Sequence, residues 1–361
     1  MPLNQMKMKL FLLFLMQLIS LVILVPRAPA ENEEPVRIVA DSLVSIKTSR
    51  GVADMPVDIS IDWNQPQPLV SRAVIVFHGK SRDVDGYFKA LLLAADLASS
   101  DAKRTSVLIA PQFLNEEDAR AHHLSNGILR WRQGTWEAGS DASAPLQVSS
   151  YEVIDALISH LANPALFPNL KTIVLAGHSG GGQAIQRYAI VGRAESIAAP
   201  RIQIRYVVAN PSSYMYFSDE RPKFDGQLFQ FEKSNGSNCK NFNHWKYGPL
   251  NAREEYVRHT SLVGWQPLED AFSMKDVIYL LGTADVDTHE KDLDVTCAGE
   301  MEGPNRFLRG QAYYAWLHER HPTKWSQRMW LVPGVAHSGS KMFTSECGVD
   351  AIFGEASCSD H

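Results

Sequence analysis

The chain has 361 residues, of which 45% are hydrophobic and 21% are charged, and its formal net charge is −5. This length is enough for one large domain or for two ordinary ones. The acidic balance argues against non-specific nucleic-acid binding, because such binding needs a face rich in lysine and arginine.

The first thirty residues have the layout of a secretory signal peptide. Two lysines precede an apolar run at residues 10–25, and small residues at positions 28–30 come directly before Glu31. The run has 16 residues, fewer than the ~20 that span a bilayer, so we expect cleavage rather than a membrane anchor. Cleavage would leave a net charge of −8. We therefore expect one exported domain over residues 31–361, periplasmic or extracellular and without membrane contact.

Short apolar runs bounded by turn residues predict the strands of a mostly parallel sheet. Runs of this length that are rich in Val and Ile are typical of strands buried on both faces. They occupy residues 73–77, 106–110, 172–176, 202–209, 277–281 and 329–332. Two further runs, residues 37–46 and 57–63, alternate in the manner of an antiparallel pair at a sheet edge.

Segments with helical periodicity fall between these runs. They occupy residues 87–98, 151–161, 181–191 and 306–318. This alternation predicts an α/β fold, with helices on both faces of a mostly parallel central sheet of about eight strands. Ligands in such folds bind at the carboxyl ends of the strands.

Residues 211–275 interrupt the alternation. Twelve of these 65 residues are aromatic, about twice the 9% of the whole chain. A structureless loop of this length is unusual within a compact domain. We predict an insertion with its own small core that folds over the active rim of the sheet as a partial lid. A second irregular stretch, residues 112–149, contains Trp131 and Trp136.

Four cysteines lie beyond the leader, and an even number in an exported chain suggests two disulfides. Three pairings are possible. Pairing Cys347 with Cys358 would close a short terminal loop and leave Cys239 with Cys297, and we favour this pairing while the others remain open. The spacing contains no C-x-x-C, which argues against a zinc site.

The stretch "VLAGHSGGGQA", residues 174–184, contains the pattern G-x-S-x-G around Ser179. In this pattern the serine occupies a strained turn between a strand and a helix, so the residues two before and two after it must be small. A predicted strand precedes the motif and a predicted helix follows it. A phosphate-binding loop is a poor alternative, because Gly182-Gln183-Ala184 stands where Gly-Lys-Ser/Thr is required.

The partners that a nucleophilic serine needs follow in the expected order of serine, acid and histidine. Asp285 comes just after the strand predicted at 277–281, and His337 follows the last predicted strand. Asp287 is a rival acid, but Asp285 lies nearer the strand and would be better anchored. We predict that Ser179 is the nucleophile, His337 its base and Asp285 the group that orients the histidine.

Two backbone amides would bind the oxyanion of the reaction. One is the amide of Gly180, directly after the nucleophile, and the other lies in the loop after residues 73–77. Lys80 is the favoured second donor, with Gly79 as the alternative. We expect His78 to brace this loop rather than to act as a base.

Aromatic residues near these loops are candidates for substrate binding, and we name Tyr87, Trp131 and Tyr214, with Trp136 and Trp245 as further candidates. For each of them a structural role is the more common one. The reaction needs no metal or organic cofactor. The acidic stretch 285–294 does not fit a calcium loop of the EF-hand type, because Glu290 stands where glycine is required.

Together, "HGK", "GHSGG", "GTAD" and "GVAH" resemble the α/β-hydrolase superfamily over residues 70–345. "HGKSRDVDGYF", "APQF", "NPSSY" and "CKNFNHWKYG" resemble a poorly characterised group of exported hydrolases, distantly similar to feruloyl esterases and polyhydroxyalkanoate depolymerases. The resemblance implies the α/β-hydrolase fold and cleavage of a small or polymeric ester through an acyl-enzyme. The HGGG loop of many lipases and esterases is missing, so the acyl pocket is not defined.

Two other functions remain open at this point. A serine peptidase or amidase would use the same triad. A non-catalytic binding protein could share the fold, although such proteins usually lack a triad member and none is missing here.

Overall fold

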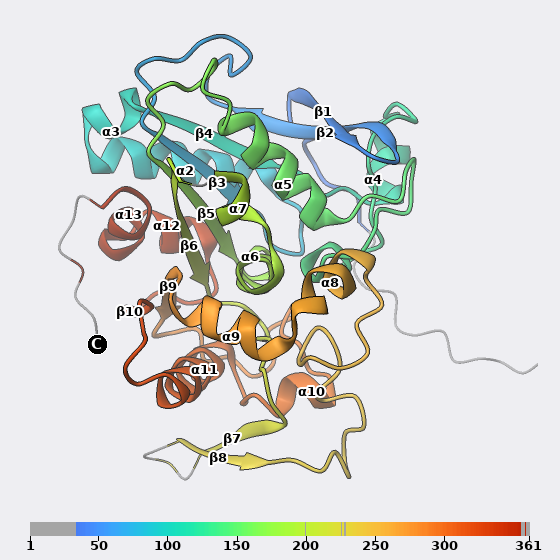
Figure 1. Cartoon of the computed structure of the whole chain (residues 1–361), viewed down its shortest axis with the longest axis vertical. Helices are drawn as coiled ribbons and strands as arrows, with labels where there is room; N and C mark the ends of the chain where they lie inside the picture. The colour runs from blue at the N-terminus through green and yellow to red at the C-terminus, as the bar shows by residue number, and fades with distance from the viewer. Residues whose placement is uncertain (1–33, 199, 225, 227–228, 355–357, 359–361) are drawn as a thin grey trace, which may run out of the picture. The chain divides into compact units, whose positions relative to one another are not determined.

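Residues 34–361 are described in this computed structural model, except positions 199, 225, 227–228, 355–357 and 359–361. The expected signal peptide, residues 1–30, lies outside the described residues. Among the described helices, none is long and apolar enough to cross a membrane. Eight strands form one mixed sheet in the order β1-β2-β4-β3-β5-β6-β9-β10 (Figure 1).

Six neighbouring strands of this sheet are parallel, and they arise from the apolar runs of the sequence. They are β3 (Arg72–Phe77), β4 (Ser106–Pro111), β5 (Thr172–His178), β6 (Gln203–Ala209), β9 (Asp276–Gly282) and β10 (Arg328–Val332). Alternate side chains enter opposite layers: Ile75 belongs to one core cluster, whereas Val74 and Val76 belong to the other. Burial on both faces explains why these runs are mostly apolar.

The expected antiparallel pair forms at one edge of the sheet, but at shifted positions. The strands are β1 (Ser42–Thr48) and β2 (Gly51–Ile59), and β2 also pairs with β4. The chain turns at positions 49–50, and Gly51 has φ +136°, which favours glycine. The second strand was predicted too late in the chain because Trp63, which is buried in the core, extends the alternation beyond the end of the strand.

Helices cover both faces of the sheet (Figure 1). One face is packed by α5 (Ser150–Leu161), α6 (Gly180–Val191), α7 (Ala194–Ala198) and α11 (Arg306–Arg320). The other is packed by α2 (Val84–Ala98), α3 (Ser100–Arg104), α12 (Gly339–Phe343) and α13 (Glu346–Phe353). α4 (Glu116–Ala121) and the 3₁₀ turn η1 (Trp136–Ala138) occupy the irregular stretch between β4 and α5. The α/β architecture expected from the sequence is therefore confirmed.

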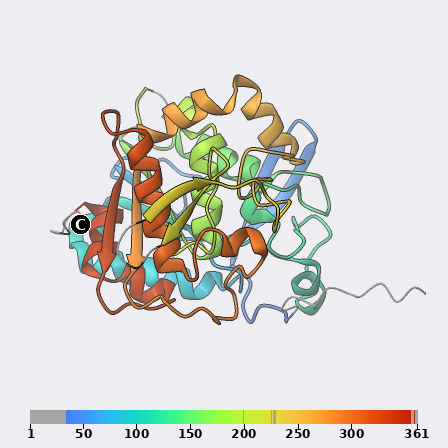
Figure 2. The ribbon, with the colours of Figure 1, turned by 90° about the horizontal axis from the view of Figure 1, so that it is seen from below.

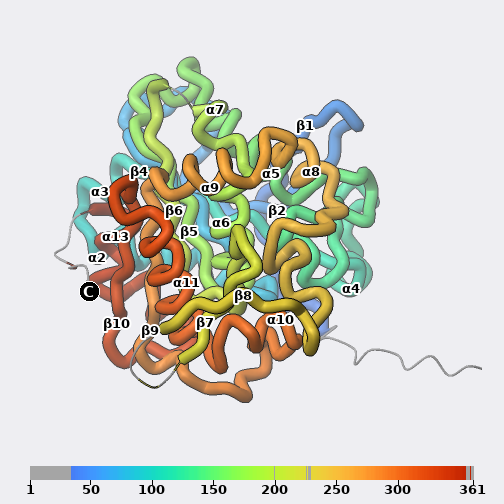
Figure 3. Tube along the Cα trace, turned by 60° about the horizontal axis from the view of Figure 1, so that its bottom comes forward, coloured from blue at the N-terminus to red at the C-terminus, as the bar shows by residue number. Residues whose placement is uncertain are grey.

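The insertion, residues 211–275, forms a hairpin and three short helices. These are β7 (Glu220–Phe224), β8 (Phe229–Lys233), α8 (Glu255–Thr260), the 3₁₀ turn η2 (Ser261–Val263) and α9 (Trp265–Ser273). The hairpin is separate from the main sheet and lies beside α11 (Figure 2). α9 lies against α6 (Figure 3).

The structure corrects the expectation that the insertion has a core of its own. Tyr214, Tyr216 and Phe272 belong to the main core of the domain. A small separate cluster gathers only around Cys239 and Phe242, against α10 (Cys297–Glu300). Aromatic side chains bury a large apolar area, and these three do so within the main core.

Two disulfides confirm the favoured pairing. Cys239 joins Cys297 with a Cα–Cα distance of 5.7 Å, and Cys347 joins Cys358 with a Cα–Cα distance of 4.9 Å. The first ties the insertion to α10, which lies in the segment after β9. The second joins Cys347, in the first turn of α13, to Cys358, which lies beyond the end of that helix.

Candidate active site

The loops that follow three parallel strands bring the candidate catalytic residues together. Ser179 directly follows β5, Asp285 follows β9, and His337 follows β10. All three lie at the carboxyl ends of their strands, the edge where ligands bind in this class of sheet.

The backbone at Ser179 is strained. Ser179 has φ +57° and ψ −118°, a combination that non-glycine residues rarely adopt. Its neighbours must be glycines: a Cβ on Gly177 would lie 2.2 Å from the Gly181 carbonyl oxygen, and one on Gly181 would lie 2.2 Å from the Phe77 carbonyl oxygen. This crowding is the steric reason for the pattern seen in the sequence.

Ser179, His337 and Asp285 form a continuous hydrogen-bonded chain. His337 Nε2 lies 3.0 Å from Ser179 Oγ, and His337 Nδ1 lies 2.8 Å from Asp285 Oδ2. Because an ionised carboxylate can only accept, Nδ1 donates to Asp285 and Nε2 is left to accept from the serine hydroxyl. The rival acid Asp287 is exposed and instead accepts from the His289 amide.

Arg306, at the start of α11, lies next to Asp285. Its side chain is fully buried, with Nη1 3.8 Å from Asp285 Oδ1 and Nη2 2.6 Å from Glu290 Oε2. Burial alone would raise the pKa of Glu290, but the Arg306 guanidinium holds that pKa below its usual value. Sequence reasoning missed Arg306, because an arginine at the start of a helix carries no signal of its partners.

The Lys80 and Gly180 amides border one small space. A Cβ on Gly180 would lie 3.2 Å from the Lys80 amide nitrogen. Within the described part of the chain, neither amide has a hydrogen-bond acceptor. Gly79 lies next to the Tyr87 hydroxyl, because a Cβ on Gly79 would lie 3.2 Å from that oxygen. Lys80 therefore stays our candidate for the second oxyanion donor.

Tyr87 connects this loop to the serine turn. Its hydroxyl lies 2.8 Å from Nδ1 of His178, and the His178 ring lies 4.5 Å from the His337 ring, measured between centroids. Burial holds the pKa of His178 well below its usual value, so the ring is neutral. Tyr87 therefore lies beside the site, with its hydroxyl engaged by the protein. The motif leaves the residue at position 178 unspecified, so sequence patterns alone do not single out His178.

His78 braces the loop between β3 and α2. Its Nε2 accepts from the Phe113 amide at 2.9 Å, and its Nδ1 lies 2.8 Å from the Gly79 carbonyl oxygen. Burial lowers the pKa of His78 to about 4, so the ring is neutral and can serve both bonds. This is the bracing role that we expected.

Two predicted pocket residues lie in the protein core instead. Trp131 is 1% exposed and its indole donates to the Ser140 carbonyl, while Tyr214 is 0% exposed and stacks on Tyr313 at 4.6 Å. Neither presents a surface that a substrate can reach. Aromatic side chains serve cores and pockets equally well, so composition could not separate the two roles.

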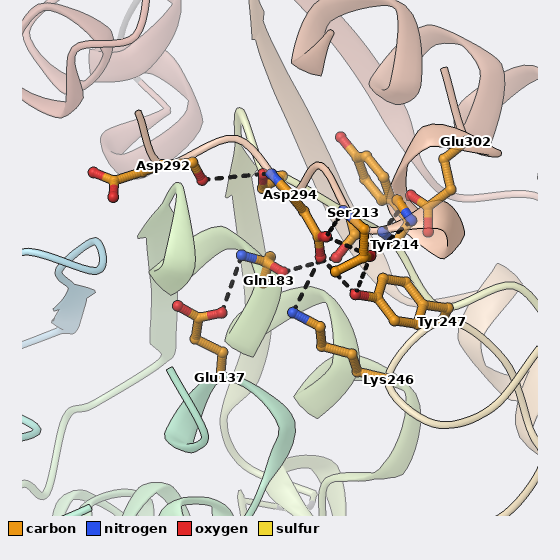
Figure 4. Close-up of polar contacts among 12 residues, drawn as sticks. Glu137, Gln183, Ser213, Tyr214, Lys246, Tyr247, Asp292, Asp294 and Glu302 are labelled. Carbon is orange, nitrogen blue, oxygen red and sulfur yellow. Dashed lines mark hydrogen bonds and ion pairs between the residues drawn. The ribbon is translucent and has the colours of Figure 1, made fainter. Parts of the chain in front are cut away.

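A buried polar network extends from Gly180 towards the insertion, and Figure 4 shows most of it. Glu137 on η1 accepts from Gln183 Nε2 at 3.1 Å, and Gln183 Oε1 accepts from Ser213 Oγ at 2.8 Å. Beside it, Lys246 pairs with Asp294 at 3.2 Å. Sequence reasoning named none of these residues as part of the site.

Tyr214 also has a buried acid at its backbone. Glu302 Oε2 accepts from the Tyr214 amide at 2.8 Å (Figure 4). Burial raises the pKa of Glu302 to about 8, although Arg309 and Arg221 act in the opposite direction. Glu302 is therefore protonated at neutral pH.

The described residues contain no group of three or more His, Cys, Asp or Glu side chains that could hold a metal ion. The acidic residues that follow β9 bind protein partners instead, as Asp294 does with Lys246 and Tyr247.

Comparison with known proteins identifies the fold. No protein-family model and no curated protein sequence matches the chain. Among solved structures, it is similar to LpqC, a poly(3-hydroxybutyrate) depolymerase from Bordetella parapertussis, with 16% identity, a TM-score of 0.54, and coverage of 88% of this chain and 91% of that one. It is also similar to poly(aspartic acid) hydrolase-1 from Sphingomonas sp. KT-1, with 19% identity, a TM-score of 0.50, and coverage of 84% and 96%. The chain has the α/β-hydrolase fold, as its motifs indicated.

Proposed function

We propose that this chain is an exported serine hydrolase that cleaves carboxylic esters. The observation that carries the proposal is the hydrogen-bonded chain from Ser179 through His337 to Asp285, set at the strand ends next to two unpaired amides. Ser179 Oγ attacks the ester carbonyl while His337 takes its proton, and Asp285 stabilises the imidazolium. The Lys80 and Gly180 amides bind the oxyanion. Water then releases the acyl group by the same route.

The geometry of the triad does not distinguish the class of bond, because one triad can cleave esters and amides alike. The two solved structures named above illustrate this range: one is a hydrolase of a polyester and the other is named for poly(aspartic acid). We favour a small or polymeric ester for this chain, with a peptide or other amide as the second candidate.

Two features support export of the protein. Both disulfides need an oxidising compartment to persist, and residues 1–30 read as a signal peptide. We also propose that the insertion forms one wall of the site, because Trp245 donates to the Ala138 carbonyl at 2.8 Å, one residue from Glu137.

The direct test is labelling of the purified mature protein with a fluorophosphonate probe, beside a Ser179→Ala variant and a Ser196→Ala variant, whose serine is exposed on α7. We expect the wild type and Ser196→Ala to react and Ser179→Ala to remain unlabelled. Labelling of Ser179→Ala at the wild-type level would show that the nucleophile lies elsewhere. A folded wild type without any labelling would favour the non-catalytic alternative. Matched p-nitrophenyl ester and p-nitroanilide substrates then separate esterase from amidase.

A further inference from the structure

Glu137 is held rigidly beside the serine turn. Its neighbour Trp136 stacks on Phe113 with ring centroids 4.6 Å apart, and the Trp136 carbonyl accepts from Ser150 Oγ at 2.6 Å. On the other side, the Ala138 carbonyl is bonded to the indole of Trp245. The side chain of Glu137 is 0% exposed. Its position is therefore set before any substrate binds.

One carboxyl oxygen of Glu137 has a partner and the other does not. Oε2 accepts from Gln183 Nε2, and the orientation of that amide is fixed because Gln183 Oε1 already accepts from Ser213. Oε1 is buried and has no hydrogen-bond partner among the described residues. A buried carboxyl oxygen without a hydrogen bond destabilises the fold unless another group supplies that bond.

The unpaired oxygen borders the same space as the two oxyanion amides. A Cβ on Gly180 would lie 2.6 Å from Glu137 Oε1 and 3.2 Å from the Lys80 amide nitrogen. Three groups therefore converge at one point: the Gly180 backbone, the Lys80 amide and Glu137 Oε1. The absence of a side chain at position 180 leaves this point open.

The charge of the reaction intermediate decides which form of Glu137 fits this space. An ionised carboxylate would repel an oxyanion at short range within a buried site, where such repulsion is strong. A protonated carboxyl instead carries an O–H group that can donate to the oxyanion. Only the protonated form therefore stabilises the transition state.

The surroundings of Glu137 favour its protonated form. Burial is the largest influence and raises the pKa of Glu137, and Asp294 raises it further. Lys246, Lys80 and Arg187 act in the opposite direction, but the net direction is upward. None of these three cations is hydrogen-bonded to the carboxyl.

We propose that Glu137 is a catalytic residue that, as a neutral carboxylic acid, donates a third hydrogen bond to the oxyanion beside the Lys80 and Gly180 amides. This inference rests on the proposed serine-hydrolase function. Glu137 donates a hydrogen bond to the oxyanion but does not transfer its proton. His337 alone therefore carries protons between Ser179, the leaving group and water.

The test compares Glu137→Gln and Glu137→Ala with the wild type on p-nitrophenyl butyrate, measuring kcat and KM across pH. Loss of one oxyanion donor lowers kcat by about 10²–10³-fold in other hydrolases, so we expect Glu137→Ala to lose on that order in kcat with little change in KM. Glu137→Gln keeps an N–H donor and should stay within about tenfold of the wild type.

The pH profile separates donation from a structural role. Wild-type kcat should fall at alkaline pH as Glu137 ionises, and Glu137→Gln should lose this decline. Glu152→Gln, which changes the capping box of α5, is the matched control and should keep it. A Glu137→Ala variant with wild-type kcat, a Glu137→Gln variant as impaired as the alanine variant, or one that retains the alkaline decline would each overturn the inference.

Different results would reject the proposed serine-hydrolase function and the role of Glu137. If Ser179→Ala turns over the ester at the wild-type rate, the proposed function falls and this inference falls with it. If Ser179→Ala is inactive and the Glu137 variants behave like the wild type, only the role of Glu137 is wrong.

Discussion

Ser179→Gly removes the proposed nucleophile and should leave a more stable fold than Ser179→Ala does. Strain at such a backbone position is worth about 1–3 kcal/mol, and glycine can adopt φ +57° without it. Glycine also gives the unfolded chain more conformational freedom, which reduces this gain in stability by about 0.5–1 kcal/mol. Ser179→Ala loses the same hydrogen bond to His337 but keeps the strain. We therefore expect Ser179→Gly to exceed Ser179→Ala in free energy of unfolding by about 0.5–2 kcal/mol.

Chemical denaturation followed by tryptophan fluorescence measures this difference. Ser196, an exposed residue of α7, is the matched control, because glycine in an ordinary helix is less stable than alanine by about 1 kcal/mol. The order of the glycine and alanine variants should thus be reversed between the two positions. A glycine variant at position 179 that is no more stable than the alanine variant would refute the strain argument.

Two further predictions concern buried acids. Asp285→Asn should lower kcat by about 10⁴-fold without unfolding the protein, because asparagine favours the wrong tautomer of His337; a loss under tenfold in steady-state assays would point to another acid. Glu302 has its pKa raised to about 8 in the folded state, so the native protein holds a proton that the unfolded chain releases above about pH 4.5. The free energy of unfolding should therefore fall between about pH 4.5 and 8, at up to about 1.4 kcal/mol per pH unit. Glu302→Gln should flatten this slope in denaturation curves recorded at several pH values, and an unchanged slope would contradict the assignment.

Much of the fold could be predicted because its signals are local. A strand buried on both faces has to be apolar along its length, and a turn as crowded as that at Ser179 has to have glycine on both sides. The chain order of Ser179, Asp285 and His337, each next to a strand end, then placed these residues on one edge of the sheet. In the structure, His337 lies within hydrogen-bonding distance of both Ser179 and Asp285.

Other features depend on contacts that local patterns do not record. Glu137 lies in an irregular stretch, and its position beside Gly180 arises only when η1 packs against α6. Arg306 meets Asp285 across 21 positions of sequence. The aromatic residues of the insertion were predicted to pack among themselves or against a substrate, but Tyr214 joins the main core because that is where the most area can be buried.

The Cys239–Cys297 bridge has a consequence for how this protein can change in evolution or by engineering. Cys297 lies in the segment that begins with Asp285, so the bridge couples the insertion to the stretch that supplies the acid. The insertion cannot be exchanged for that of a relative without breaking this link. Chimeras that transplant residues 211–302 as one block keep both ends of the bridge and the Glu302 contact to Tyr214. The insertion and the stretch that contains Asp285 would then be transferred together.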